Sequence, residues 1–412
     1  MRNSKASMGF IFATVLIDMI SIGLIIPVLP AIAGSFSSTQ VDHAWAYLWV
    51  AGAFGLANFI GSPILGALSD QYGRRPVLLL GFSGLALSFF VTAAATALWM
   101  LVAIRLVSGA MQANISVANA YVADITPPAE RAKRFGQLGA AFGVGFILGP
   151  ATGGMLGAID LRLPFWVAGG LALVNLAYGY FVLPESLAPE KRRTFDWRTA
   201  NPLSSLKKLT ELKGIGVLVV VIGLSALAQF ILHSSWVLFT TFKFGWGPKE
   251  NGLSLFAVGF MSVLVQGFLL PRMLKRFSTP RLVVLSLVSS SLTYLGWALV
   301  PEAWMLIVLI GLNVFGYAAS AAIQSIVSNS VDATRQGATM GAVAGLNSLM
   351  AVLGPLIGPG LLTGVAELPR GDWRIGAPFL LCAALQALAL YFALVYQRRH
   401  PSQAALQVNP HA

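Results

Sequence analysis

The sequence has few charged residues and a single cysteine. Only 10% of its 412 residues are charged and 57% are hydrophobic, whereas about a quarter of the residues of a soluble domain are charged. This composition cannot cover an ordinary aqueous surface, which argues against a soluble enzyme, a nucleic-acid-binding protein or a disordered chain. Cys382 lies in an apolar run and has no partner in the chain, which excludes an intrachain disulfide.

Several chemical signatures are also missing. The chain has no G-x₄-G-K-[S/T] phosphate loop, no clustered Cys and His ligands, and no nucleophile–base pair of recognisable spacing. ATP-driven pumping is therefore unsupported. We expect no cofactor, no metal site and no enzymatic activity.

Long apolar runs are abundant, and about 20 such residues cross about 30 Å of hydrocarbon. The first run has no secretory cleavage pattern, so we expect it to be retained. The predicted fold is an all-α membrane protein with twelve transmembrane helices in two six-helix bundles. The predicted spans lie near 8–32, 45–68, 77–96, 98–122, 134–158, 163–183, 214–240, 250–271, 281–300, 303–327, 338–364 and 375–397.

Basic residues predict the orientation. With both termini in the cytoplasm, 21 of the 27 Lys and Arg lie in inside segments, five lie outside, and Arg105 lies within a span. This asymmetry follows the positive-inside rule and accounts for the net charge of +12 without a nucleic-acid partner. The predicted parts are an N-terminal bundle, a cytoplasmic linker, a C-terminal bundle and a cytoplasmic tail, at residues 1–183, 184–213, 214–400 and 401–412.

The two halves resemble each other weakly. LGPATGG begins at Leu148 and LGPLIGPG at Leu353, while the segments that begin at Gly66 and Gly267 are also similar. The two offsets, 205 and 201 residues, nearly agree. They indicate duplication of a six-span unit, and transporter halves of this kind commonly enclose a site near the membrane midplane. Chance recurrence of Gly-Pro pairs in glycine-rich membrane helices is the alternative.

Three motifs carry a family resemblance. The loop between the second and third spans of the major facilitator superfamily is resembled by GALSDQYGRRP. The fifth-span signature of the superfamily's antiporters is resembled by GFILGPATGG. The first span of drug–proton antiporters, most narrowly the tetracycline exporters, is similar to DMISIGLIIPVLP. The resemblance implies a monomeric exporter. In the loop, Gly66 and Gly73 permit a tight turn, and Asp70, Arg74 and Arg75 complete the motif. The fifth-span motif comprises Gly145, Gly149, Pro150, Gly153 and Gly154, whose small side chains allow close helix packing.

Asp18 and Arg105 are the predicted proton-coupling residues. Asp18 lies about ten residues, or roughly 15 Å, from the cytoplasmic end of its span, near the midplane. A carboxylate there costs about 2.5–3.5 kcal/mol on insertion scales, so it should face a cavity or a partner. Arg105 lies about 10 Å below the outer surface. We expect the two to share a cavity, with Arg105 setting the proton affinity of Asp18. An ion pair that never titrates is the structural alternative.

A second charge cluster is expected at the cytoplasmic end of the first half. Asp124 ends the fourth span, close in sequence to Arg131. Together with Asp70 and Arg74, these residues are predicted to close a cytoplasmic gate. Each charge taken alone could equally be a solvated loop residue.

The sequence departs from the tetracycline exporters at two positions. Ser88 and Ser290 align where that family has intramembrane acids, which argues against a metal–tetracycline chelate as substrate. His233 could be a second titrating station or a structural interface residue. The predicted substrate-binding candidates are Asn58, Gln112, Asn114, Gln229, His233, Trp236 and Gln324, although some of these side chains could serve only helix packing.

The predicted function is export of a small amphipathic organic compound or drug by a proton-coupled antiporter of the inner membrane. The expected partners are this small molecule, protons and lipid. An uptake permease or uniporter on the same fold is the first alternative, which the direction of proton movement would distinguish. A membrane enzyme or a non-transporting receptor is the second.

Overall fold

The computed structural model describes residues 2–112, 114–127, 130–197, 201, 216–329 and 333–399, and these residues form helices without any strand. They include ten helices long and apolar enough to cross a membrane. An eleventh span results if Ala303–Leu312 and Gly316–Ile326, which meet at 55°, are one bent span, and a shorter apolar helix covers Gly9–Ile25. The all-α membrane architecture is therefore confirmed, whereas the number twelve stays a prediction. The predicted tail, 401–412, lies outside the described residues.

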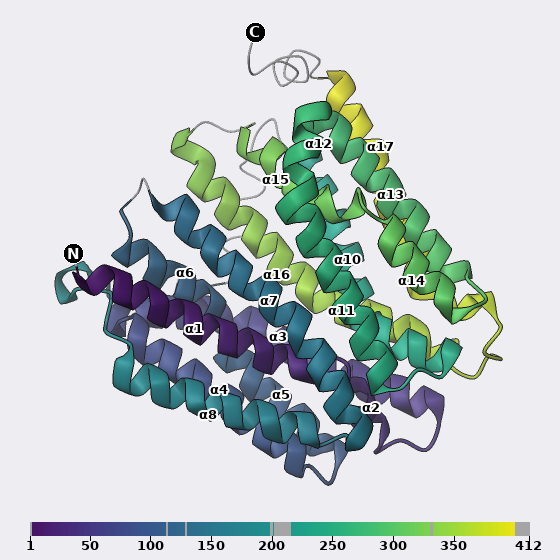
Figure 1. Cartoon of the computed structure of the whole chain (residues 1–412), viewed down its shortest axis with the longest axis horizontal. Coiled ribbons are helices and arrows are strands. Elements are labelled where there is room, and N and C mark those ends of the chain that lie inside the picture. The colour runs from purple at the N-terminus through teal and green to yellow at the C-terminus, as the bar shows by residue number, and fades with distance from the viewer. Residues whose placement is uncertain are drawn as a thin grey trace. The chain divides into compact units, whose positions relative to one another are not determined.

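One compact unit comprises Met1–Pro202 and Trp246–Phe256. Within it α1 packs along α7 and α8, α3 along α5, and α4 along α8 (Figure 1). Its core surrounds Phe82, Tyr121 and Leu138, all at most 1% exposed. The helices are α1 (Arg2–Ile25), α2 (Leu29–Gly34), α3 (Gln40–Tyr72), α4 (Arg74–Ala94), α5 (Leu98–Met111), α6 (Asn114–Ile125), α7 (Arg131–Ile159) and α8 (Leu163–Val182).

The second unit comprises Leu203–Gly245 and Ala257–Ala412, so α11 contributes to both units. Here α10 packs along α16 and α17, and α13 along α17, which repeats the pairings of α1 and α4 in the first unit. Its helices are α10 (Gly216–Phe244), α11 (Pro248–Leu264), which continues through a π-turn at Val265–Leu269, α12 (Leu270–Arg276), α13 (Thr279–Leu299), α14 (Ala303–Leu312), α15 (Ala319–Asn329), α16 (Ala333–Thr363) and α17 (Ala377–Arg399).

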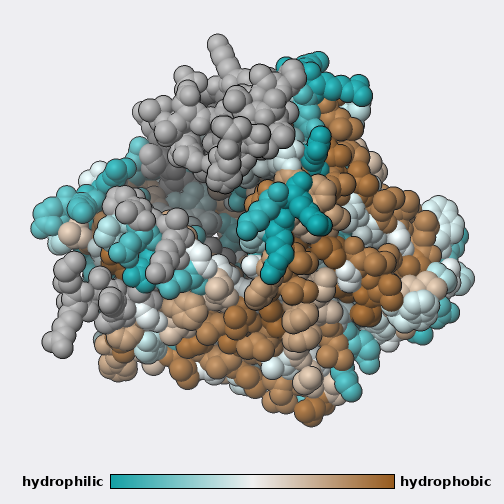
Figure 2. All heavy atoms as spheres, turned by 45° about the horizontal axis from the view of Figure 1, so that its top comes forward, coloured by the Kyte–Doolittle hydropathy of each residue, from teal (hydrophilic) through white to brown (hydrophobic). Residues whose placement is uncertain are grey.

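The outer faces of the helices are apolar. Trp99, Ile159 and Phe181 are more than 70% exposed, and Figure 2 shows broad hydrophobic surfaces with hydrophilic side chains gathered at their margins. Contiguous apolar surface of this extent is rare on a soluble monomer. A bilayer accommodates it, so the protein is a multi-pass membrane protein.

The repeated Gly-Pro motif has the same packing role in both units. A Cβ on Gly149 or Gly153 of α7 would overlap the backbone of α1 at Gly23 or Leu24. A Cβ on Gly354 of α16, 205 residues after Gly149, would meet the backbone of α10 at Phe230. The duplication inferred from sequence thus coincides with a repeated close approach of two helices.

Three predicted spans are interrupted. The span predicted at 8–32 ends α1 at Ile25 and resumes as α2 at Leu29, and the other two breaks fall at corresponding places in the repeat. The span predicted at 98–122 ends its first helix at Gln112, which caps α5, and resumes as α6 at Asn114. The span predicted at 303–327 breaks at Asn313, which caps α14. The latter two break points lie 201 residues apart, matching one of the two repeat offsets. Discontinuous helices at corresponding positions of repeated halves are a common sign of a transporter's binding region.

Candidate functional site

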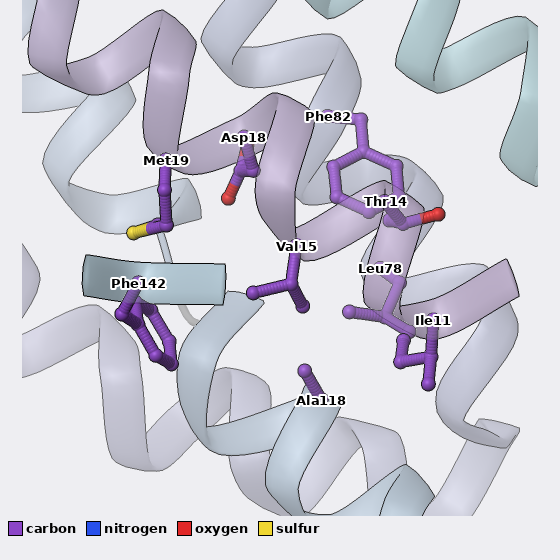
Figure 3. Close-up of a pocket in the computed structure, with 9 residues that line it drawn as sticks. All are labelled: Ile11, Thr14, Val15, Asp18, Met19, Leu78, Phe82, Ala118 and Phe142. Atoms are coloured by element: carbon purple, nitrogen blue, oxygen red, sulfur yellow. The ribbon is translucent and has the colours of Figure 1, made fainter. Parts of the chain in front are cut away.

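Asp18 lies in the wall of a small cavity inside the first unit. It is 4% exposed, and Figure 3 shows its side chain pointing inward among Val15, Met19 and Phe142. Apolar side chains dominate the lining, with Thr14 as the other polar member. The lining residues come from four helices, namely Ile11, Thr14, Val15, Asp18 and Met19 of α1, Leu78 and Phe82 of α4, Ala118 of α6, and Phe142 of α7.

The size of this cavity limits what it can hold. The space inside it is about 10 Å³, near the lower limit for one water molecule. An organic compound does not fit there, whereas a proton or a single water does. The geometry therefore suits protonation and deprotonation of Asp18 rather than direct contact with a substrate.

Arg105 is buried on α5, away from the lining of the Asp18 cavity. It is 6% exposed, and its guanidinium carbon lies 5.8 Å from the centre of the Phe54 ring on α3. Nε and Nη2 are buried and have no hydrogen-bond partner among the described residues. Arg105 does not line the cavity of Asp18, so coupling between the two residues stays a prediction.

Asn58 and Gln112 meet where the fourth span is interrupted. The Asn58 amide on α3 donates to the backbone carbonyl of Gln112 at 2.8 Å and approaches that of Gly109 at 3.4 Å. These carbonyls belong to the last turn of α5, where helix termini leave acceptors without an intrahelical donor. Asn58 therefore stabilises the break. The side chain of Asn114 lies outside the described residues.

The polar candidates of the second unit fall into two groups. Gln229 and His233 are exposed and four residues apart on α10, so they share one face, and Gln324 of α15 is exposed as well. Trp236 is only 3% exposed. It packs against Trp297 and Phe379, with ring centroids 4.9 and 6.0 Å away, so this indole belongs to an aromatic core.

The α3–α4 loop holds a network centred on Arg74, which is 9% exposed. Arg74 forms ion pairs with Asp70 at 2.5 Å and with Asp124 at 3.1 Å, and donates to the Ser69 hydroxyl at 2.7 Å. Arg75 contacts the Tyr180 carbonyl and ring. The side chain of Arg131 lies outside the described residues.

Glu185 is a member of this network that the sequence analysis missed. Its carboxylate accepts hydrogen bonds from the backbone N–H groups of Arg74 and Arg75 at 2.9 and 3.2 Å, at the first turn of α4. Gly73 precedes that turn with φ of +104°, and a Cβ there would overlap the Glu185 carboxylate. Gly66, by contrast, lies within α3, so the turn is made at Gly73. The sequence feature that could have indicated this role is an acidic residue, Glu185, directly after the sixth predicted span.

The remaining motif residues serve packing. Gly145, Gly149 and Gly153 face α1 closely enough that a Cβ would overlap it, and Gly154 is also buried. Pro150 lies inside α7 without ending it. Within the described ranges, no three His, Cys, Asp or Glu side chains converge as they would around a metal ion.

Apolar helices interrupted at corresponding places in two repeated halves define a multi-pass membrane transport protein. More narrowly, the chain belongs to the Major Facilitator Superfamily, whose sequence profile matches residues 11–355 and 218–410.

Individual relatives match nearly the whole chain. The class C tetracycline resistance protein of Escherichia coli is 35% identical over 92% of this chain and 96% of its own length. Multidrug resistance protein 2 of Bacillus subtilis is 28% identical over 98% of both. The crystal structure of the human organic anion transporter MFSD10 superimposes with a TM-score of 0.70 at 22% identity, covering 95% of this chain and 99% of that one. This last similarity shows a shared fold.

Proposed function

We propose that the protein is a proton-coupled antiporter that exports a small amphipathic organic compound or drug by alternating access. Its whole-length similarity to proteins named for tetracycline resistance and multidrug resistance supports this function. As finer points, we propose twelve spans, cytoplasmic termini, a monomer in the inner membrane, and no enzymatic activity.

The observation that carries the proposal is the burial of Asp18 in a cavity the size of one water molecule. Desolvation disfavours the charged carboxylate, whereas contact with water favours it. If the two half-transporters tilt and change the hydration of this cavity, Asp18 takes up a proton on one side and releases it on the other. One proton entering with the gradient gains about 2.3 kcal/mol per 100 mV.

The charge network around Arg74 is the candidate for gating. Arg74 joins α4 to the end of α6 through Asp124, while Glu185 connects the α3–α4 loop to the segment after α8. These contacts all lie within the first unit, so they hold the ends of its helices together while the unit tilts. We propose that this network is the cytoplasmic gate, and that Arg131 contributes to it.

Polar side chains on apolar spans are the candidates for the substrate path. A polar side chain within an apolar span is costly in lipid and normally faces the protein interior or water. Gln229, His233 and Gln324 are exposed on such spans, so we propose that they border the path of the substrate. Asn58, Gln112 and Asn114 lie at the break of the fourth span, within the first unit, and we propose that they contact the substrate within that unit. Trp236 is buried, and we propose that it supports the residues that border the substrate path without contacting the substrate itself.

A compound screen tests the function directly. Cells that express the wild type, the variant Asp18→Asn or an empty vector are grown against a panel of antibiotics and organic dyes, with the amount of protein in the membrane measured. The wild type should protect against at least one compound, and Asp18→Asn should not. Protection by Asp18→Asn equal to that of the wild type would remove Asp18 from the mechanism, and wild-type cells that accumulate the compounds would reverse the direction of transport.

A further inference from the structure

Arg105 is a buried cation whose charge is not balanced by a hydrogen-bonded partner. Nε and Nη2 have no such partner within the described part of the chain, although both atoms are buried and the residue as a whole is only 6% exposed. Arg74, also a buried arginine of this unit, is matched by the carboxylates of Asp70 and Asp124. Asp18, in turn, lines a cavity that does not include Arg105.

The described surroundings of Arg105 orient the guanidinium without neutralising it. Phe54 lies 5.8 Å from its central carbon, and a ring face attracts a cation while leaving the in-plane N–H groups unoccupied. Tyr47 is also buried, seven residues before Phe54 on the same face of α3. A planar fork of donors held in this way matches a carboxylate, which can accept two parallel hydrogen bonds.

We propose that Arg105 binds the anionic group of the transported compound, and that the compound is therefore an amphipathic organic acid whose aromatic or apolar part packs near Phe54. The inference rests on the proposed export function and names the substrate class of that function. An unpaired buried charge is costly, and an anion that arrives and leaves with each cycle compensates it only while bound. Binding would thus be strongest for compounds that are ionised.

The membrane potential favours this choice of substrate. With one proton entering per cycle, export of a neutral compound moves one elementary charge inward, and 100 mV then sustains a concentration ratio of about 50-fold. Export of a monovalent anion moves a second charge in the same sense, and the sustained ratio rises to about 2,000-fold. A transporter with one proton-exchanging carboxylate can therefore maintain a much larger gradient of an anion.

Binding to the purified full-length protein in detergent tests the inference. The probes are aromatic monocarboxylic acids, each paired with its uncharged primary amide and beginning with 2-naphthoate and 2-naphthamide, and affinity is measured by ligand-induced thermal shift. Wild type should bind the preferred acid about 10-fold to 100-fold more tightly than its amide, as expected for hydrogen bonds to charged groups. Arg105→Gln should lose this ratio, Arg105→Lys should retain part of it, and Arg281→Gln, an exposed arginine, should keep it fully.

Two results would overturn the inference. One is a wild-type protein that prefers none of the acids over its amide, and this result stands even if Arg105→Gln fails to fold. The other is an Arg105→Gln variant that folds and keeps the preference, in which case Arg105 is a structural cation. Transport measured in proteoliposomes distinguishes failure of this inference about Arg105 from failure of the proposed export function. Proton-driven export of amides without acid preference leaves the export function intact, whereas a wild type that exports no compound under a proton gradient contradicts it.

Discussion

Asp18 places a carboxylate in a cavity lined mainly by apolar side chains. A lone acid in an apolar first span is costly unless it has a special environment, and that cost is visible in the amino-acid sequence. The structure supplies the environment, a cavity of about 10 Å³ lined mainly by apolar side chains. The size of the cavity could not be predicted, because it depends on how side chains from four helices pack.

Replacing Asp18 separates proton coupling from folding. Asp18→Asn preserves the shape of the side chain and removes the titrating group, so proton-driven export should fall at least about 100-fold, at the lower end of what removing a proton-transfer group costs. The unfolding temperature should stay within a few degrees of the wild type. Asp42→Asn, at an exposed position, is the control and should transport normally. Substrate-driven proton flux in vesicles provides the measurement, and normal flux in Asp18→Asn would contradict the assignment.

The glycines of α7 provide a prediction about stability. Gly153→Ala forces a methyl group against the Leu24 carbonyl of α1, and overpacking of this kind costs about 1–3 kcal/mol. Gly139→Ala, on the same helix, meets no atom within 4 Å and should be neutral or stabilising by up to about 1 kcal/mol because alanine favours helix. Thermal unfolding in detergent compares them, and equal midpoints would refute the packing role of the motif.

The helix positions were predictable, and so was the break between α1 and α2, which falls at Pro27. The two breaks at corresponding places in the repeat were not, because neither of those predicted stretches contains a proline, a common cause of a kink. The break at Gln112 is stabilised from another helix by Asn58, and Asn313 at the second break accepts a hydrogen bond from Ser289 at 3.0 Å. Tertiary contacts of this kind do not appear in a local pattern.

The start of α4 shows the same limit. Gly73, its N-cap, offers no side-chain acceptor, and the acceptor comes instead from Glu185, about 110 residues later. Sequence analysis could predict the loop motif that contains Arg74. It could not predict that the segment after α8 folds back onto this loop.

Removing the Glu185 carboxylate should loosen this element. Loss of a helix cap costs about 1 kcal/mol, so Glu185→Ala should exchange the amide hydrogens of Arg74 and Arg75 roughly fivefold faster. Glu190→Ala, also in the segment after α8 and exposed, serves as the comparison and should leave the exchange unchanged. Hydrogen–deuterium exchange read by mass spectrometry gives both rates. Identical rates in the two variants would mean that Glu185 does not cap α4.

In the molecule as a whole, the internal repeat is visible both in the amino-acid sequence and in the structure. The 205-residue offset reappears in the glycines that face α1 and α10, and the 201-residue offset reappears in the two breaks. The orientation of the protein in the membrane is inferred only from the distribution of Lys and Arg. It therefore stays a prediction.

Single cysteines can test this orientation. Cys382 is buried, with its thiol 3.2 Å from the Ala228 carbonyl, so a Cys382→Ala background is a mild change. In that background we expect Glu302→Cys to react with an impermeant maleimide on intact cells, and Ser278→Cys to react only in everted vesicles. The two positions flank the ends of α13. Labelling of both from the same side would contradict the proposed topology.

If Asp18 exchanges the transported proton, substrate binding should release that proton, and proton release from the purified protein measures this step. A compound identified in the export screen is added to the wild type and to Asp18→Asn in weakly buffered detergent solution, and the change in pH is recorded. We expect release of up to one proton per molecule from the wild type and none from Asp18→Asn, with the compound still bound by the variant. Equal proton release from both proteins would contradict it.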